Sequence, residues 1–218
     1  MAKKIVITAL ICVLVGAAAF AGAYFYPVLK VQEVVATGQQ STTEEEINAV
    51  TAELEGQNLL RVNTEEIARK TSALPWVAKA KVSTKLPNQV VIDIQEHQAV
   101  LYAPREDGDH LIDTNGKVFV IDQHPEGAVA VTGTREDDER MYSDIISVLA
   151  ALGDHNRVHI KEIKAQKAEA LSLVLHDGRE VYWGSKENSH DKAVAFGVAL
   201  SRGEQRLDIS GAPVIAVR

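Results

Sequence analysis

The sequence contains a single cysteine, Cys12, which lies inside a long uncharged run near the N-terminus. One cysteine excludes a disulfide within the chain, and the rest of the chain has no thiol to act as a nucleophile or a metal ligand. Glycine-rich phosphate loops and low-complexity segments are absent as well. A folded domain outside the cytoplasm would therefore depend on packing alone.

Acidic residues outnumber basic ones beyond the N-terminal run. Residues 31–218 contain 20 of the 23 basic residues and all 30 acidic ones, so this part of the chain has a net charge of −10. Proteins that bind nucleic acid gain most of their affinity by neutralising phosphates with lysine and arginine. The composition therefore argues against nucleic acid as a partner.

Catalytic motifs are few, and each has a simpler structural explanation. His155 and His159 are four residues apart, but they fall at a predicted helix-to-strand junction and no HExxH motif is present. Ser189 and Lys192 match the S-x-x-K pattern of serine acyltransferases that act on cell-wall peptides, but the companion S-D-N and K-T-G motifs are missing. Ser189 is explained as a helix N-cap. We therefore expect no catalytic residue, no metal ligand and no cofactor.

Residues 5–26 carry no charge and form a run long enough to cross a bilayer as a helix. Lys3 and Lys4 precede the run, and the aromatic residues 24–26 close it. The positive-inside rule therefore predicts that residues 1–4 are cytoplasmic and that the rest of the chain lies outside the cytoplasm. The alternative is a cleaved signal peptide, because Ala21-Gly22-Ala23 resembles a cleavage site, but the run is longer than a usual signal core.

Residues 28–97 predict a small α+β unit. Alternating polarity predicts a strand over 28–37, and Thr43 followed by Glu46 predicts a capped helix that ends by Gly56. A second capped helix is predicted from Asn63, and two strands joined by a turn at 86–88 follow. In the first of these strands, Trp76 and Ala78 are assigned to the buried face together with Ala80 and Val82.

Residues 98–218 predict a second, β-rich domain with two helices. We expect strands at 99–103, 111–112, 118–121, 158–165, 170–176 and 180–183, with helices at 138–152 and 189–201. Gly153 is assigned as the C-cap of the first helix. The last segment, 206–217, is predicted to be one extended strand, and its Pro213 favours the edge of the sheet. The fold class as a whole is α+β.

The order of several short motifs resembles the FtsQ/DivIB family of cell division proteins. The motifs are VQEVVATG (31–38), TEEEI (43–47), GQNLLRVNTEEI (56–67), LPWVAKAKVSTKLPNQVVIDIQEHQAV (74–100) and LIDTNGKVF (111–119). The resemblance implies a POTRA domain over 28–97 and a β domain over 98–218. It also implies a single-pass membrane scaffold at the division septum, without catalytic activity, that recruits and regulates septal peptidoglycan synthesis.

The resemblance further implies the kind of partner. In the family, small single-pass coiled-coil proteins of the FtsB/DivIC and FtsL type add along the last strands of the β domain, and other divisome membrane proteins also bind. Transferred to this chain, the surface would consist of Asp208, Ile209, Ser210, Gly211, Ala212, Pro213 and Val214, with Trp183 on the adjacent strand. An edge strand suits this role, because its unpaired backbone groups can accept a further strand.

Two alternatives from other classes stay open. A POTRA protein of a secretion or membrane-assembly system would contain the same first module, but it would normally carry several copies or a barrel of many strands. An anchored cell-wall acyltransferase would require Ser189 as its nucleophile.

Overall fold

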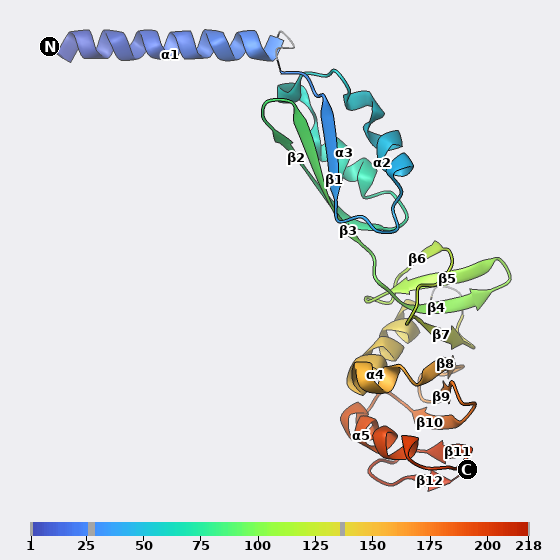
Figure 1. Cartoon of the computed structure of the whole chain (residues 1–218). Helices are drawn as coiled ribbons and strands as arrows, with labels where there is room; N and C mark the ends of the chain where they lie inside the picture. The colour runs from blue at the N-terminus through green and yellow to red at the C-terminus, as the bar shows by residue number, and fades with distance from the viewer. Residues whose placement is uncertain (1, 26–28, 136–137, 218) are drawn as a thin grey trace. The chain divides into compact units, whose positions relative to one another are not determined.

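The computed structural model describes residues 2–25, 29–135 and 138–217 (Figure 1). The predicted end of the membrane segment at Tyr26 and the predicted start of the first strand at Val28 lie outside these residues. The chain divides into two units, Met1–Glu96 and His97–Arg218. The mixed α+β fold class expected from the sequence is confirmed.

The first unit begins with one long helix, α1 (Ala2–Phe25). Its stretch Ile5–Gly22 is apolar and long enough to cross a membrane, and none of it is buried within the protein. A helical stretch that is apolar on all sides and is not buried within the protein is typical of a segment surrounded by lipid.

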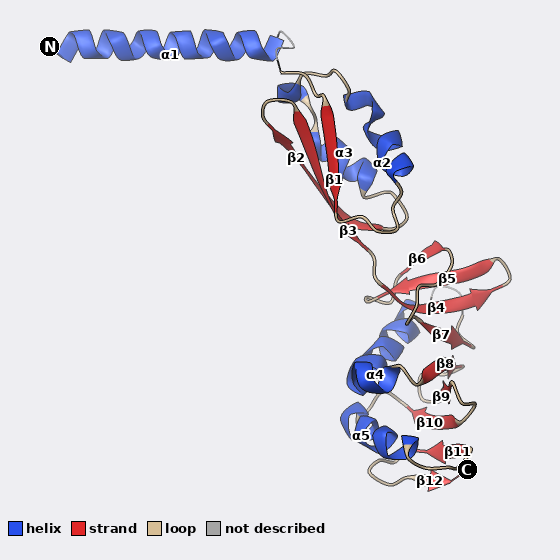
Figure 2. Cartoon of the chain, in the orientation of Figure 1, coloured by secondary structure: helices blue, strands red, loops and turns tan. Residues whose placement is uncertain are grey.

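A three-stranded sheet backed by helices follows α1. The strands are β1 (Glu33–Thr37), β2 (Val77–Lys85) and β3 (Gln89–Glu96), in the order β1-β3-β2, with β1 parallel and β2 antiparallel to β3. The helices are α2 (Glu44–Thr51) and α3 (Thr64–Thr71), with the short 3₁₀ segments η1 (Ala52–Leu54) and η2 (Leu59–Arg61) between them. Apolar residues of α2 and α3 pack with Val90, Ile92 and Ile94 of β3, so the helices cover one face of the sheet (Figure 2).

Both predicted caps are present. The Thr43 hydroxyl accepts the Glu46 backbone N–H while the Glu46 carboxylate accepts from the Thr43 backbone, which is a complete capping box. Asn63 caps α3 by accepting the backbone N–H of Glu66. These caps could be predicted because both partners lie within one turn of chain.

Two details of the first unit differ from the sequence prediction. The first strand begins at Glu33 rather than Val28, because residues 29–31 instead contact the segment around Asn58. In β2 a register shift between Val77 and Lys79 buries Val77 and exposes Ala78, so the assignment of Ala78 to the buried face is wrong, whereas Trp76, just before the strand, is half-buried. A bulge adds one residue and reverses the alternation locally.

The second unit is a nine-stranded sheet with two helices on one of its faces (Figure 2). Its order is β12-β11-β10-β9-β8-β7-β4-β5-β6. The strands are β4 (Ala99–Arg105), β5 (Gly108–Asp113), β6 (Val118–Ile121), β7 (Val129–Thr132), β8 (Ile160–Ala165), β9 (Leu171–Leu175), β10 (Glu180–Gly184), β11 (Arg206–Asp208) and β12 (Ala216–Val217). The helices are α4 (Glu139–Arg157) and α5 (Ser189–Leu200).

Several boundaries in this unit differ from the prediction. β7 was not among the strands predicted from the sequence. Gly153 does interrupt α4, with a φ of 69°, but a further helical turn continues to Arg157. Val158 belongs to the end of that turn and is exposed, so β8 starts at Ile160. Residues 206–217 do not form one strand, because a turn separates β11 from β12.

The Asn115-Gly116 turn between β5 and β6 is organised by the buried carboxylate of Asp113. Its oxygens accept the backbone N–H groups of Asn115 and Lys117 at 2.8 and 3.0 Å, and His97 Nδ1 lies 2.9 Å away. Burial opposes ionisation, but these hydrogen bonds outweigh it and lower the pKa of Asp113. Gly116 has a φ of 84°, which favours glycine at that position.

Candidate functional site

The candidate partner site lies at the C-terminal edge of the nine-stranded sheet. β10 pairs with β11 in parallel, and β11 pairs with β12 antiparallel through Leu207 opposite Val217 and Asp208 opposite Ala216. β12 is the last strand in this direction, so it forms the edge within the described chain. Of the segment 206–217 that was predicted to lie at the edge, β12 does so, whereas β11 is flanked on both sides.

The segment between β11 and β12 is a turn that is anchored in the core. Ile209 is 0% exposed, and its backbone N–H donates to Tyr182 O at 3.0 Å. Ala212 and Ile215 pack against the same core from partly buried positions. Apolar side chains therefore point inward at every third residue rather than every second, and this spacing is incompatible with a flat strand.

The eight residues assigned to the partner surface fall into three groups by exposure. Trp183 and Ile209 are 0% exposed core residues and present no surface to a partner in this fold. Asp208 and Ala212 are half-buried. The Asp208 carboxylate accepts hydrogen bonds from the Ser210 backbone N–H at 2.9 Å and from the Ser210 hydroxyl at 2.7 Å. The other four, Ser210, Gly211, Pro213 and Val214, are exposed and lie on the turn.

Exposed apolar side chains mark the surface that the structure does present at this edge. Val214 is 69% exposed and Val217 is 62% exposed. Val217 was not predicted as a surface residue, because 206–217 was predicted to be one strand and the partner surface was assigned to residues 208–214. The three-residue spacing of Ile209, Ala212 and Ile215 is the signal that could have shown the bend.

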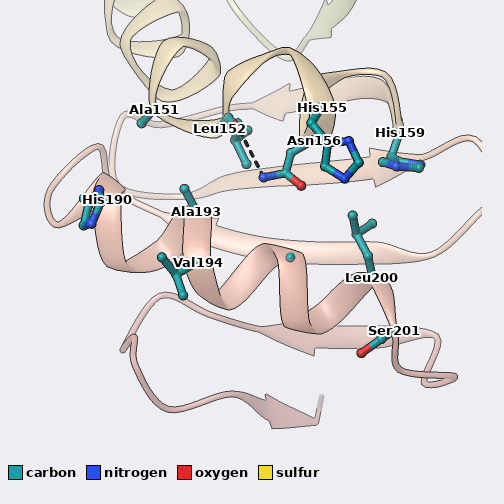
Figure 3. Close-up of a pocket in the computed structure, with 11 residues that line it drawn as sticks. Ala151, Leu152, His155, Asn156, His159, His190, Ala193, Val194, Leu200 and Ser201 are labelled. Carbon is teal, nitrogen blue, oxygen red and sulfur yellow. Dashed lines mark hydrogen bonds between the residues drawn. The ribbon is translucent and has the colours of Figure 1, made fainter.

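A second surface feature is a shallow groove of about 710 Å³ between the end of α4 and α5 (Figure 3). Small and apolar side chains line it together with His155, His159 and His190. The rings of His155 and His159 have centroids 6.3 Å apart in an edge-to-face arrangement. His190 lies near the start of α5, at the opposite end of the groove from His159 (Figure 3). Within residues 2–25, 29–135 and 138–217, no group of three or more His, Cys, Asp or Glu side chains is arranged to hold a metal ion.

The S-x-x-K motif does not form a serine–lysine pair. Ser189 is the first residue of α5 rather than its N-cap, which is Asn188, and its hydroxyl donates to Lys186 O. Lys192 Nζ instead donates to Ser185 O at 2.8 Å and lies 5.9 Å from the centre of the Trp183 ring. Burial lowers the pKa of Lys192, as a general base requires, but its amine is directed at a carbonyl and not at the serine.

Comparison with known proteins identifies both units. Residues 29–97 match the model of the FtsQ-type POTRA domain, and residues 101–209 match that of the C-terminal domain of cell division protein FtsQ/DivIB. Cell division protein FtsQ of Corynebacterium glutamicum is 36% identical over 199 residues, which cover 90% of this chain and 90% of that protein. FtsQ of Mycobacteroides abscessus is 28% identical, with 89% of this chain and 63% of that protein covered.

Among solved structures, the major extracytoplasmic domain of the trans isomer of DivIB from Geobacillus stearothermophilus is 18% identical. It covers 50% of this chain and 98% of that chain, with a TM-score of 0.37, which is too low to support an argument. The matches to the two domain models and to the corynebacterial relative confirm the resemblance read from the sequence. The chain belongs to the FtsQ/DivIB family of cell division proteins.

Proposed function

We propose that this protein is a non-enzymatic scaffold of the divisome. It spans the cell membrane once through α1, with residues 1–4 in the cytoplasm and both folded units outside it, and it acts at the division septum. There it links and regulates septal peptidoglycan synthesis through protein–protein contacts. The observation that carries this proposal is that cell-division domain models cover both folded units, over 29–97 and 101–209.

The proposed partners are small single-pass coiled-coil proteins of the FtsB/DivIC and FtsL type, together with other divisome membrane proteins. We place their docking surface at β12 and the preceding turn. β12 is a short edge strand, and an extended segment of a partner can continue the ladder with main-chain hydrogen bonds. Val214 and Val217 supply exposed apolar contacts beside that edge.

This placement revises the residues on which the proposal depends. Ser210, Gly211, Pro213 and Val214 stay in the proposed surface, whereas Ile209 and Trp183 act only by supporting the edge from the core. A substitution at either buried residue would disturb the fold and the interface together. The test therefore has to use an exposed residue.

The experiment compares Val214→Lys with Val158→Lys. The two valines are 69% and 67% exposed in the same unit, so both changes have a similar cost in the folded state, but Val158 lies at the end of α4 and not at the edge. Binding of a purified coiled-coil partner is measured by calorimetry. We expect Val214→Lys to weaken binding at least tenfold and Val158→Lys to leave it unchanged. Equal affinities for the two variants would exclude this edge as the docking surface.

A further inference from the structure

One end of the POTRA unit is built around residues 29–33, the first described residues after α1. The backbone N–H groups of Gln32 and Glu33 donate to Asn88 O in the β2–β3 turn at 2.9 and 3.3 Å, and Asn88 Nδ2 donates to Gln32 Oε1 at 2.7 Å. Leu29 O accepts the backbone N–H of Leu59 in η2 at 2.7 Å. The hairpin turn and η2 are thus both attached to residues 29–33.

Chain length keeps this end close to the membrane. Leu29 follows Phe25, the last residue of α1, by four residues, and these can span at most about 14 Å. α1 itself has 24 residues, so it is about 36 Å long against a hydrocarbon core of about 30 Å, and its last turn reaches the headgroups. The Arg61 guanidinium of η2 lies 5.7 Å from the centre of the Tyr24 ring in that turn.

The side chains at this end suit a headgroup layer. Leu86, in the hairpin turn, is 67% exposed. Lys85 directly precedes it, and Lys30 and Arg61 are exposed on residues 29–33 and on η2, the segments joined at this end; we call Leu86 and these three cations the membrane-proximal end. Two exposed carboxylates, Glu33 and Glu55, lie nearby, and Glu33 accepts a hydrogen bond from the Gln89 side chain. The local positive excess is small, so Leu86 must supply much of any attraction.

We infer that the membrane-proximal end docks on anionic phospholipid headgroups of the bilayer that holds α1. Leu86 enters the interface, and Lys30, Arg61 and Lys85 lie among the phosphates. One leucine and three cations would bind a membrane weakly on their own, but the tether makes the contact intramolecular, at an effective concentration on the order of millimolar. Docking would fix the tilt of the POTRA unit. The inference rests on the proposed membrane anchor.

The test uses the full chain in lipid nanodiscs, with Cys12→Ser and a single new cysteine for a fluorophore. Thr84→Cys places the label beside Leu86, and Ala73→Cys places it before the start of β2, at the other end of that strand. Quenching by headgroup-labelled lipid is compared between phosphatidylcholine and a mixture with about one third phosphatidylglycerol. Lys85→Ser is matched by Lys81→Ser, another exposed lysine on the same face of β2.

We expect strong quenching at position 84, weak quenching at position 73, and an increase at position 84 with phosphatidylglycerol. Leu86→Ser should lower the ratio of docked to free unit about tenfold, and Lys85→Ser about fivefold on the anionic lipid, with no effect of Lys81→Ser. If quenching at position 84 changes neither with Leu86→Ser nor with lipid charge, the inference is overturned, because the tether alone would then explain the quenching. Elution of the chain apart from the nanodiscs would instead refute the membrane anchor.

Discussion

Replacing Glu96 with glutamine should release the loop between β1 and α2. Glu96 is the last residue of β3, and its carboxylate accepts the backbone N–H groups of Gln40, Ser41 and Thr42 at 2.7–3.1 Å. Three consecutive N–H groups that converge on one carboxylate form an anion-binding concavity made by the backbone. The contacts join residues more than fifty positions apart, so they hold the loop against the sheet.

The size of the effect follows from the kind of hydrogen bond that is lost. Hydrogen bonds to a charged group contribute about 1.5–3 kcal/mol each when well buried, but Glu96 is only partly buried and glutamine keeps one carbonyl acceptor. We therefore expect a loss of about 1–2 kcal/mol in the local stability of the loop. That corresponds to exchange of the amide hydrogens of residues 40–42 roughly tenfold faster, since 1.4 kcal/mol is a factor of ten.

The stabilisation that the Glu96 carboxylate gives to the loop should be lost at low pH. Burial opposes ionisation of Glu96, but the backbone donors outweigh it, so its pKa is lower in the folded protein than the ordinary value of 4.5. The folded state therefore binds fewer protons than the unfolded state, and the stabilisation is fully present above pH 4.5 and is lost as the pH falls through the lower folded value. The difference between wild type and Glu96→Gln should shrink over that range.

Hydrogen exchange followed by mass spectrometry measures this directly, with Gln95→Ala as the control, because Gln95 is exposed on the neighbouring position of β3. Unchanged exchange at residues 40–42 in Glu96→Gln at neutral pH would show that the carboxylate does not hold the loop.

Two further predictions concern the second unit. Ile209→Ala should destabilise it by about 2–4 kcal/mol, whereas Val214→Ala should change it by less than about 0.5 kcal/mol, in urea unfolding followed by tryptophan fluorescence; equal effects would mean that the C-terminal turn is not anchored as described. Arg179 donates to the carbonyls of Ala199, Leu200 and Arg202 at the end of α5 and to the Asp177 carboxylate. Arg179→Lys should cost about 1–2 kcal/mol in the same assay, because lysine cannot supply this fork of donors.

The features that were predicted correctly from the sequence depend on interactions between residues that are close together in the chain. The caps at Thr43 and Asn63 were predicted because each side chain and the backbone group that it binds lie within one turn of chain. The order of strands and helices in the first unit followed from polarity alternation, and its family followed from motifs that are dense between residues 31 and 119.

The features that could not be predicted depend on contacts between residues that are far apart in the sequence. The turn at 209–215 exists because Ile209 packs into a core that also contains Trp183, and nothing adjacent in the chain shows that core. β7 was missed because its four residues, Val129–Thr132, are recognisable as a strand only between β4 and β8. The carboxylate of Glu96 likewise binds a loop that is far from it in sequence.

The most direct measurement of the divisome role is depletion of this protein in the cells that make it, with septa counted by microscopy and a fluorescent copy followed in undepleted cells. We expect filamentous or branched cells without septa, and a fluorescent band at the division site. We also expect that a copy carrying Val214→Lys restores septa poorly, whereas a copy carrying Val158→Lys restores them fully. Normal septation after depletion, with the fluorescent protein spread evenly around the membrane, would refute a role of this protein in the divisome.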